Sequence, residues 1–475
     1  MSSVDSGNLV ASLWTLQQGL LTRMKQPLLQ PSMAEGLLDH LRALSELKGF
    51  SRRQLSRCEQ GLTTKEWLPS LLALCDEDIS QTSSVSNPKE VEEIEKVQRA
   101  TRARLLAVQE LVSSYTPWEL PEFASVRNDI KVGPELEERP SLRQLPLFID
   151  DLHNRLERVM PSVARGDRGQ YEKLQGLLPQ ARTNALRLIE TLRTIATEAE
   201  KLADAMEFGF LLNPRRKLMS VGFNVETGKL EPACYDLLAT ESRTAVFAAV
   251  AKEDIQQESW FRMGRTHTIA NGNPVLRSWT GTMFEYLMPM LWMRSYPNTL
   301  LDRSRIAVVD YQQTYANRKG VPWGISESAY YKLDESGNYQ YHAFGVPQLA
   351  MMKGELDLLV ISPYSTFLGL TVNATQALRN LHRMDRMGWF GPYGFYEAAD
   401  YGPLDKVRRS NCRVVRSWMA HHQGMSILAI ANFLCDNVVQ RWFHNSRRVQ
   451  ATELLLHEKP ISHVPRTGVP RSNAA

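Results

Sequence analysis

Four glutamates in the second half of the sequence lie in strings rich in aromatic residues and glycine. The strings are YDLLATESR around Glu241, SWTGTMFEYLMP around Glu285, VPWGISESAY around Glu327 and YGFYEAADY around Glu397. Enzymes that cleave or transfer glycosidic bonds use one protonated carboxyl group and a second carboxylate as base or nucleophile, and aromatic faces stack on sugar rings. An apolar wall also raises the pKa of a carboxyl group, which a general acid requires. These residue types therefore indicate chemistry on carbohydrates.

Each of these glutamates also has a structural explanation. A glutamate near the start of a helix can cap it, and Glu285, between Phe284 and Tyr286, could be a buried, hydrogen-bonded group. Glu327 is better placed for catalysis, because it follows a loop in which Gly324 allows a close backbone approach. Active residues concentrate in loops on rigid scaffolds. Glu327 is therefore the first candidate.

The pair His421 and His422 in MAHHQGM is the best candidate for a metal site. Adjacent residues on a helix point about 100° apart, so they rarely bind one ion together. We therefore expect one histidine to pack inside and the other to face the cleft, and we predict no metal and no cofactor. The sequence also lacks GxxxxGK[ST], HExxH and GxSxG.

The composition is that of a globular protein. The 475 residues are 43% hydrophobic, and 56 basic against 52 acidic residues leave a net charge of +4. Such a balance argues against nucleic acid as a partner and fits a neutral ligand such as a sugar. Five widely spaced cysteines predict reduced thiols. No apolar stretch reaches the roughly 18 residues of a membrane span, and we see no signal peptide, so we expect a soluble chain.

The texture of the sequence changes near residue 205. Before it, Leu, Glu, Arg and Gln recur at helical spacing, as in LRLIETLRTIATEAEKLADAM, which predicts a helical scaffold over residues 1–205. After a predicted β-hairpin with Thr227-Gly228 in its turn, helices joined by aromatic and glycine-rich loops predict a second domain over residues 206–460. A flexible tail should cover residues 461–475. The expected helices of the second domain span residues 237–252, 281–293, 299–319, 364–372, 373–387 and 417–435.

Several long strings, in order, carry a family resemblance. From residue 208 to 458 the chain resembles the glycoamylase-like cyclisation domain of bacterial cyclic β-1,2-glucan synthases, and the preceding helical stretch is more loosely similar to the segment before that domain. The strings are YDLLATESR, SWTGTMFEYLMP, SYPNTLLD, VPWGISESAY, NYQYHAFGVP, ISPYSTFL, YGFYEAADY and MAHHQGMSILAIAN.

The resemblance implies a mainly α fold, an (α/α) six-hairpin toroid preceded by an amphipathic helical region. It also implies a retaining transglycosylation that cuts linear β-1,2-glucan and joins the new end to the chain's other end. The implied catalytic residues are Glu327 and Glu241, with Glu285 third. The implied sugar-binding residues are Asp236, Trp279, Tyr286, Trp323, Tyr396, Glu397, His421 and His422.

Two other functions stay open at this point. One is hydrolysis of β-1,2-glucan by an endo-glucanase, and the other is carbohydrate binding without turnover by a fragment of a synthase. The expected partners are a β-1,2-glucan chain and separately encoded glycosyltransferase and phosphorylase-like domains of the synthase. We expect a cytoplasmic location, or one peripheral to the inner membrane.

Overall fold

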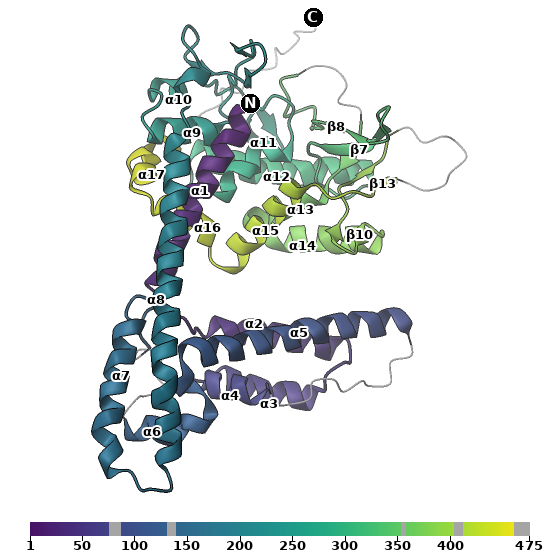
Figure 1. The fold of residues 1–475 in the computed structure, drawn as a ribbon. Helices are drawn as coiled ribbons and strands as arrows, with labels where there is room; N and C mark the ends of the chain where they lie inside the picture. Colours follow the sequence, from purple (N-terminus) through teal and green to yellow (C-terminus); the bar gives the residue numbers. More distant parts are fainter. Residues whose placement is uncertain (76–86, 131–138, 353–357, 403–411, 460–475) are drawn as a thin grey trace, which may run out of the picture. The chain divides into compact units, whose positions relative to one another are not determined.

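The computed structural model describes residues 1–75, 87–130, 139–352, 358–402 and 412–459. The chain divides into two compact units. Residues 20–196 form one, here named the helical unit, and residues 1–19 together with residues 197–475 form the other, here named the mixed unit (Figure 1). The predicted tail over residues 461–475 lies outside the described residues.

The helical unit consists of amphipathic helices, as its leucine spacing predicts. In α2, the buried Leu37, Leu41 and Leu44 recur every three or four residues and pack into one of the two cores of this unit. Leu152 and Leu174 belong to the other core. The helices are α2 (Ser32–Glu46), α3 (Arg52–Leu62), α4 (Trp67–Ala73), α5 (Pro88–Tyr115), α6 (Ala124–Asp129), α7 (Leu145–Val159) and the greater part of α8 (Arg168–Ala205).

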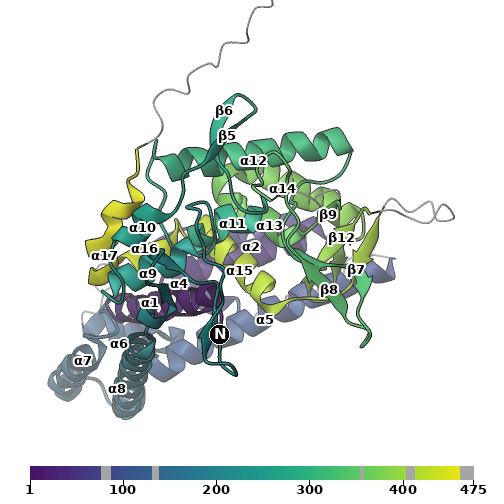
Figure 2. The same ribbon diagram turned by 90° about the horizontal axis from the view of Figure 1, so that it is seen from above.

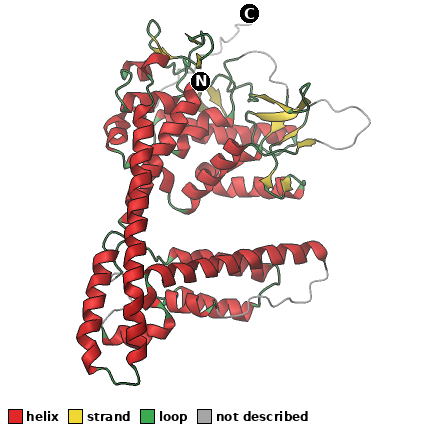
Figure 3. Ribbon diagram, in the orientation of Figure 1, coloured by secondary structure: helices red, strands yellow, loops and turns green. Residues whose placement is uncertain are grey.

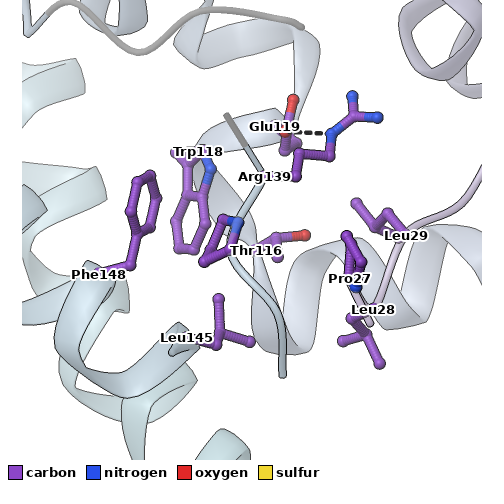
Figure 4. A pocket seen from close by; sticks show the side chains of 10 residues that line it. Pro27, Leu28, Leu29, Thr116, Trp118, Glu119, Arg139, Leu145 and Phe148 are labelled. Atoms are coloured by element: carbon purple, nitrogen blue, oxygen red, sulfur yellow. Dashed lines mark hydrogen bonds and ion pairs between the residues drawn. The ribbon is translucent and has the colours of Figure 1, made fainter. Parts of the chain in front are cut away.

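A small cavity of about 20 Å³ in the helical unit is lined mainly by apolar side chains. Trp118 and Phe148 face each other across it, with ring centroids 5.6 Å apart (Figure 4). Its carboxylate, Glu119, is buried and accepts a hydrogen bond from Arg139 and another from Arg127. Among the described residues that line this cavity, Glu119 alone carries a carboxyl group, so the cavity offers no pair of carboxyl groups for catalysis.

The mixed unit holds one large core to which the first helix contributes. Val10, Ala11 and Trp14 of α1 (Ser3–Met24) are buried in that core. A Cβ on Gly7 would lie 2.4 Å from Ala245, so glycine allows α1 to approach α9 closely. Residues 1–19 therefore join the mixed unit, whereas the sequence assigns them to a helical domain ending near residue 205; the division instead falls between residues 196 and 197.

Short helices make up most of the remaining mixed unit, where α13 packs on α14 and α15 (Figure 2). The mainly α fold class is confirmed. Closure of the helices into a six-hairpin toroid stays a prediction. The helices are α9 (Arg243–Ala251), α10 (Glu258–Arg262), α11 (Met283–Leu287), α12 (Leu300–Lys319), α13 (Pro363–Leu368), α14 (Leu370–Arg386), α15 (Ala420–Leu434), α16 (Val438–His444) and α17 (Arg447–Thr452).

All strands of the described residues lie in the mixed unit and pair antiparallel (Figure 3). The predicted hairpin is present, with Gly228 in its turn at a φ of +64°. In the pair β7–β8, Ala329 lies opposite Tyr341. The pairs are β1 (Leu212–Asn213) with β2 (Leu218–Met219), β3 (Phe223–Asn224) with β4 (Lys229–Leu230), β5 (His267–Ala270) with β6 (Asn273–Leu276), β7 (Ser328–Leu333) with β8 (Tyr339–His342), β10 (Phe390–Gly391) with β11 (Gly394–Phe395), and β12 (Ala398–Asp400) with both β9 (Val360–Ile361) and β13 (Arg413–Val415).

Within the described residues, no helix combines the length and the apolar character needed to cross a bilayer.

Candidate active site

A cavity of about 380 Å³ in the mixed unit is lined by Glu241, Glu285 and Glu327 together. These residues come from three places in the chain: the start of α9, the helix α11 and the loop before β7. The cavity therefore brings together three carboxyl groups, and their negative charges repel one another when the groups are ionised. The wall is completed by Arg216, Val221, Ala233, Cys234, Tyr235, Asp236, Leu237, Thr240, Trp279, Thr280 and Ala343.

Glu241 is held just before the first turn of α9. The hydroxyl of Thr240 donates to its Oε2 at 3.0 Å. Burial raises the pKa of Glu241, and the negative charges of Glu285 and Glu327 raise it further. The predicted helix over residues 237–252 starts only at Arg243, which leaves Glu241 in a loop facing the cavity.

Both carboxylate oxygens of Glu285 accept hydrogen bonds from the loop that precedes it, residues 278–282. Glu285 is 4% exposed and forms a capping box with Thr282 at the start of α11. Its oxygens accept hydrogen bonds from the amides of Trp279 at 2.9 Å and Thr282 at 3.0 Å, and from the hydroxyls of Ser278 at 2.7 Å and Thr280 at 2.9 Å. These donors occupy both carboxylate oxygens and leave little room for a sugar. The arrangement suits a group that orders the loop.

The loop held by Glu285 also packs closely against the loop that contains Gly345 and Val346. Gly281 has a φ of +78°, and its carbonyl accepts a hydrogen bond from the amide of Val346 at 3.1 Å. A Cβ on Gly345 would lie 1.7 Å from the carbonyl oxygen of Thr280, so only glycine fits there. The floor of the cavity is therefore rigid on this side.

A buried guanidinium joins the two segments that carry Glu241 and Glu285. Arg243 donates to the carbonyl oxygens of Thr240 at 2.8 Å, Glu285 at 2.6 Å and Tyr286 at 2.5 Å. These bonds satisfy carbonyl groups near α9 and α11 that would otherwise be buried without donors. They fix the spacing between the two helices, and with it the positions of the two carboxyl groups.

Glu327 is held by two tyrosines. The hydroxyl of Tyr341 lies 2.8 Å from its Oε1, and the hydroxyl of Tyr364 donates to its carbonyl oxygen at 3.0 Å. Burial raises the pKa of Glu327 to about 7; the hydrogen bond from Tyr341 acts against this rise, and the charge of Glu285 adds to it. A carboxyl group with such a pKa can hold and release a proton near neutrality.

Glu397 and His422 form a buried pair next to Tyr341. Nδ1 of His422 lies 2.8 Å and 3.0 Å from the two carboxylate oxygens of Glu397, and the amide of Ala329 donates to that carboxylate at 3.2 Å. The side chains of both residues are 1% exposed. The ring of Tyr364 stacks on His422 with a centroid distance of 3.7 Å. Neither member of the pair lines the cavity.

The remaining predicted residues differ in their placement. Trp279, 56% exposed, lines the cavity, as does Asp236, which lies 3.5 Å from the guanidinium of Arg216. His421 is exposed, with its ring 6.4 Å from Tyr341. His421 and the three others are absent from the lining: Tyr286 donates to the carbonyl of Leu276, Trp323 lies in the core, and the ring of Tyr396 lies 5.0 Å from that of Trp418 in a tilted arrangement.

Sequence reasoning missed Tyr235, Tyr341, Tyr364 and Arg243. Tyr341 and Tyr364 lie within NYQYHAFGVP and ISPYSTFL, two of the strings that carry the resemblance. These two strings therefore contain the signal for the tyrosine hydroxyl groups that hold Glu327. In the part of the chain that the structure describes, no three His, Cys, Asp or Glu side chains gather as ligands of a metal ion would.

Comparisons with known proteins identify similar sequences. Residues 234–447, which include all four glutamates, match the family model described as "Glycoamylase: Putative glucoamylase". The chain is 39% identical over 278 residues to the cyclic beta-(1,2)-glucan synthase NdvB of Rhizobium meliloti (strain 1021), a match that covers 58% of this chain. It spans only 10% of the length of that relative. The predicted resemblance to a glycoamylase-like domain is confirmed.

Solved structures with a similar arrangement of elements include two β-1,2-glucanases. One is the endo-beta-1,2-glucanase from Talaromyces funiculosus in complex with sophorose, with a TM-score of 0.42, 14% identity and coverage of 85% of this chain and 84% of that chain. The other is the beta-1,2-glucanase from Parabacteroides distasonis, with a TM-score of 0.41, 13% identity and coverage of 57% and 41%.

Proposed function

We propose that this chain remodels β-1,2-glucan by a retaining transglycosylation that turns a linear glucan into a ring. The observation that carries the proposal is the presence of Glu241 and Glu327 in one cavity, both with a raised pKa. The similarity to a cyclic β-1,2-glucan synthase supports the choice of substrate. The exposed indole of Trp279 offers a face on which a sugar ring can stack.

Glu241 and Glu327 act as the acid/base and nucleophile-side pair. Because each charge disfavours the other, the pair loses its protons in two steps, and between them one group is protonated while the other is ionised. The protonated group gives its proton to the glycosidic oxygen as the bond to the anomeric carbon breaks, and the ionised group forms a bond to that carbon. A hydroxyl at the other end of the same glucan then attacks the anomeric carbon, the bond from that carbon to the carboxylate breaks, and the proton of the attacking hydroxyl passes to the first group.

Glu285 keeps the pair in this state. Its negative charge lies close enough to raise the pKa of Glu241 and that of Glu327. Its own oxygens are occupied by loop donors, so it serves as a fixed charge. Arg216 and Asp236, which line the cavity, would bond to sugar hydroxyls.

The test is incubation of the purified chain with long linear β-1,2-glucan, followed by mass spectrometry of the products. Cyclisation yields a product that lacks one water relative to a linear chain of the same length. Hydrolysis yields shorter linear chains that carry heavy oxygen when the reaction is run in heavy-oxygen water. Binding without any change in the glucan contradicts the proposal and favours a non-catalytic carbohydrate-binding fragment.

The partners follow from the same proposal. A chain that cyclises glucan needs an enzyme that makes the linear polymer, which in the synthases is a glycosyltransferase. A separate phosphorylase-like protein would adjust the length of the glucan. A cytoplasmic location, or one peripheral to the inner membrane, stays a prediction.

A further inference from the structure

We propose that Glu397 and His422 are positioning residues that set the direction of the hydrogen bond made by Tyr341 and, through it, the protonation of Glu327. This inference rests on the proposed catalytic role of Glu327. The three distances that carry it run in series: 2.8 Å from Glu397 to Nδ1 of His422, 3.4 Å from Nε2 of His422 to the hydroxyl of Tyr341, and 2.8 Å from that hydroxyl to Glu327.

The first link determines which nitrogen of His422 carries hydrogen. Both oxygens of Glu397 face Nδ1, so Nδ1 carries a hydrogen that it donates to the carboxylate. The amide of Ala329 holds the same carboxylate in place, and the ring of Tyr364 lies nearly parallel to the imidazole at an interplanar angle of 10°. A ring whose Nδ1 donates to Glu397 can present Nε2 to Tyr341 as an acceptor, in the way that outer partners orient histidines in many sites.

The second link gives Tyr341 two alternative arrangements. When Glu327 is ionised, the Tyr341 hydroxyl donates its hydrogen to the carboxylate. When Glu327 is protonated, the carboxyl group donates to the Tyr341 oxygen, and the Tyr341 hydrogen turns to Nε2 of His422. A hydroxyl has one hydrogen and two lone pairs, so it satisfies both states only if a second acceptor stands behind it. His422 is that acceptor, which suits a catalytic group that must gain and lose a proton.

Groups from several elements surround this network, but the described residues give the Glu327 carboxyl group only one hydrogen-bond partner, Tyr341. The others act on Glu327 through charge or burial. Glu397 therefore reaches Glu327 by way of the Tyr341 hydroxyl. The titratable and charged groups around the network are Asp5 of α1, Arg216, Tyr235, Asp236, Glu241, Glu285, Tyr364 and His421.

The experiment is a carboxyl-carbon NMR titration of protein labelled at glutamate, with the Glu327 signal assigned from its loss in Glu327→Gln. We expect Tyr341→Phe to raise the proton affinity of Glu327 about tenfold, a shift of about one pKa unit, because the bond that Tyr341 donates to the ionised carboxylate is stronger than the bond that it accepts from the protonated group. Tyr330→Phe is the matched control on the same hairpin: it removes a hydroxyl that bonds to Gln340 at 2.8 Å, and it should leave the titration unchanged.

The decisive comparison uses Glu397→Gln in two backgrounds. In the wild type, this change weakens Nε2 as an acceptor, turns the Tyr341 hydrogen towards Glu327 and lowers the proton affinity of Glu327 several-fold. In Tyr341→Phe, the same change should leave the titration of Glu327 where it is, because the connecting hydroxyl is gone. The proposal is overturned if Glu397→Gln shifts the titration of Glu327 equally in both backgrounds. It is also overturned if Tyr341→Phe by itself leaves the titration of Glu327 at its wild-type position.

A kinetic readout separates this inference from the proposed function. If the chain turns over linear β-1,2-glucan, the alkaline limb of its pH–rate profile should move to higher pH in Tyr341→Phe and to lower pH in Glu397→Gln. A wild-type chain without turnover contradicts the proposed function, but the NMR titration still decides on the network. A loss of stability with an unchanged titration means that these residues serve packing only, and the proposal fails.

Discussion

The helical unit and the mixed unit differ in what they bury. Among the described residues of the helical unit, the buried polar side chains are Thr101, Thr116 and Glu119, against two cores that are rich in leucine. The mixed unit buries many more polar groups, and most of those near its cavity are hydrogen-bonded. Burial of polar groups without partners is costly, so a polar interior needs a precise set of donors and acceptors. The apolar interior of the helical unit is therefore typical of a packing scaffold, whereas the hydrogen-bonded polar interior of the mixed unit is typical of a functional site.

The two buried glutamates Glu119 and Glu285 show the same difference at the scale of one residue. Arg127 and Arg139 balance the charge of Glu119, so little of its field extends further. The donors to Glu285 are amides and hydroxyls, which stabilise its charge without cancelling it. Burial is the main cause of the raised pKa of Glu241, and the uncancelled charge of Glu285 adds to it.

The largest effect should come from Glu327→Gln. This change keeps the size of the side chain and removes its ability to exchange a proton, so the rate on linear β-1,2-glucan should fall by about 10²–10⁴-fold with binding retained. Steady-state kinetics and glucan-binding calorimetry check this. Glu122→Gln, an exposed position of the helical unit paired with Lys173, is the control. Turnover near the wild-type rate would remove Glu327 from the mechanism.

Among the substitutions predicted here, Leu152→Ala in the helical unit should lower the free energy of unfolding most. Leu152 is fully buried in α7, and leucine-to-alanine changes in cores cost about 2–5 kcal/mol of unfolding free energy. Urea denaturation measures the loss. Leu147→Ala, on the same helix but 73% exposed, should stay within about 0.5 kcal/mol of the wild type. Equal costs at the two positions would contradict the core described here.

Glu285→Gln should weaken both the fold and the site. The amide nitrogen would face the amides and hydroxyls that now donate to the carboxylate, a cost of about 2–3 kcal/mol. Loss of the fixed charge should also lower the pKa of Glu327, so the alkaline limb of the rate profile moves to lower pH. Denaturation and pH-dependent kinetics are the measurements. A stable variant with an unchanged profile would make Glu285 neither a loop anchor nor a fixed charge.

The smallest expected effect is a pH dependence of stability. The pKa of Glu327 rises from 4.5 to about 7 on folding, so the folded state binds the proton more tightly than the unfolded state. The stabilisation is complete below pH 4.5 and is lost as the pH rises to about 7. Glu327→Gln should therefore be more stable than the wild type at pH 8, by about 1–2 kcal/mol, and equal to it at pH 4.

Denaturant titrations at the two pH values test this dependence, with Glu226→Gln on an exposed hairpin as the control. A stability difference that is the same at both pH values would show that Glu327 does not take up its proton preferentially in the folded state.

The sequence predicts helices well wherever a leucine stripe has to be buried. The periodic stretch that ends at Met206 becomes α8, and the expected helix over residues 299–319 appears as α12. Periodicity predicts that α1 has an apolar face but does not identify the core that receives it, so the placement of residues 1–19 in the mixed unit does not follow from the sequence. That placement depends on the fit of Trp14 and Gly7 against α9 and its surroundings.

The site was predictable in its carboxylates and not in the groups that hold them. Glu241, Glu285 and Glu327 stood out by their aromatic and glycine-rich strings, and the structure brings all three to one cavity. Tyr286 follows Glu285 on α11, about 100° round the helix, so its ring packs inside while Glu285 reaches the loop. The network from Glu397 to Tyr341 depends on strand register and on helix packing, neither of which a local string contains.

The contact between Gly345 and Thr280 has a consequence for how this protein can change over generations. Any side chain at position 345 would collide with the carbonyl oxygen of Thr280, so a random library or natural drift should retain glycine there. The two loops must then vary together or not at all. New substrate preferences would have to arise from side chains elsewhere in the cavity wall, such as Arg216, while the backbone of the loop that carries Glu285 stays the same.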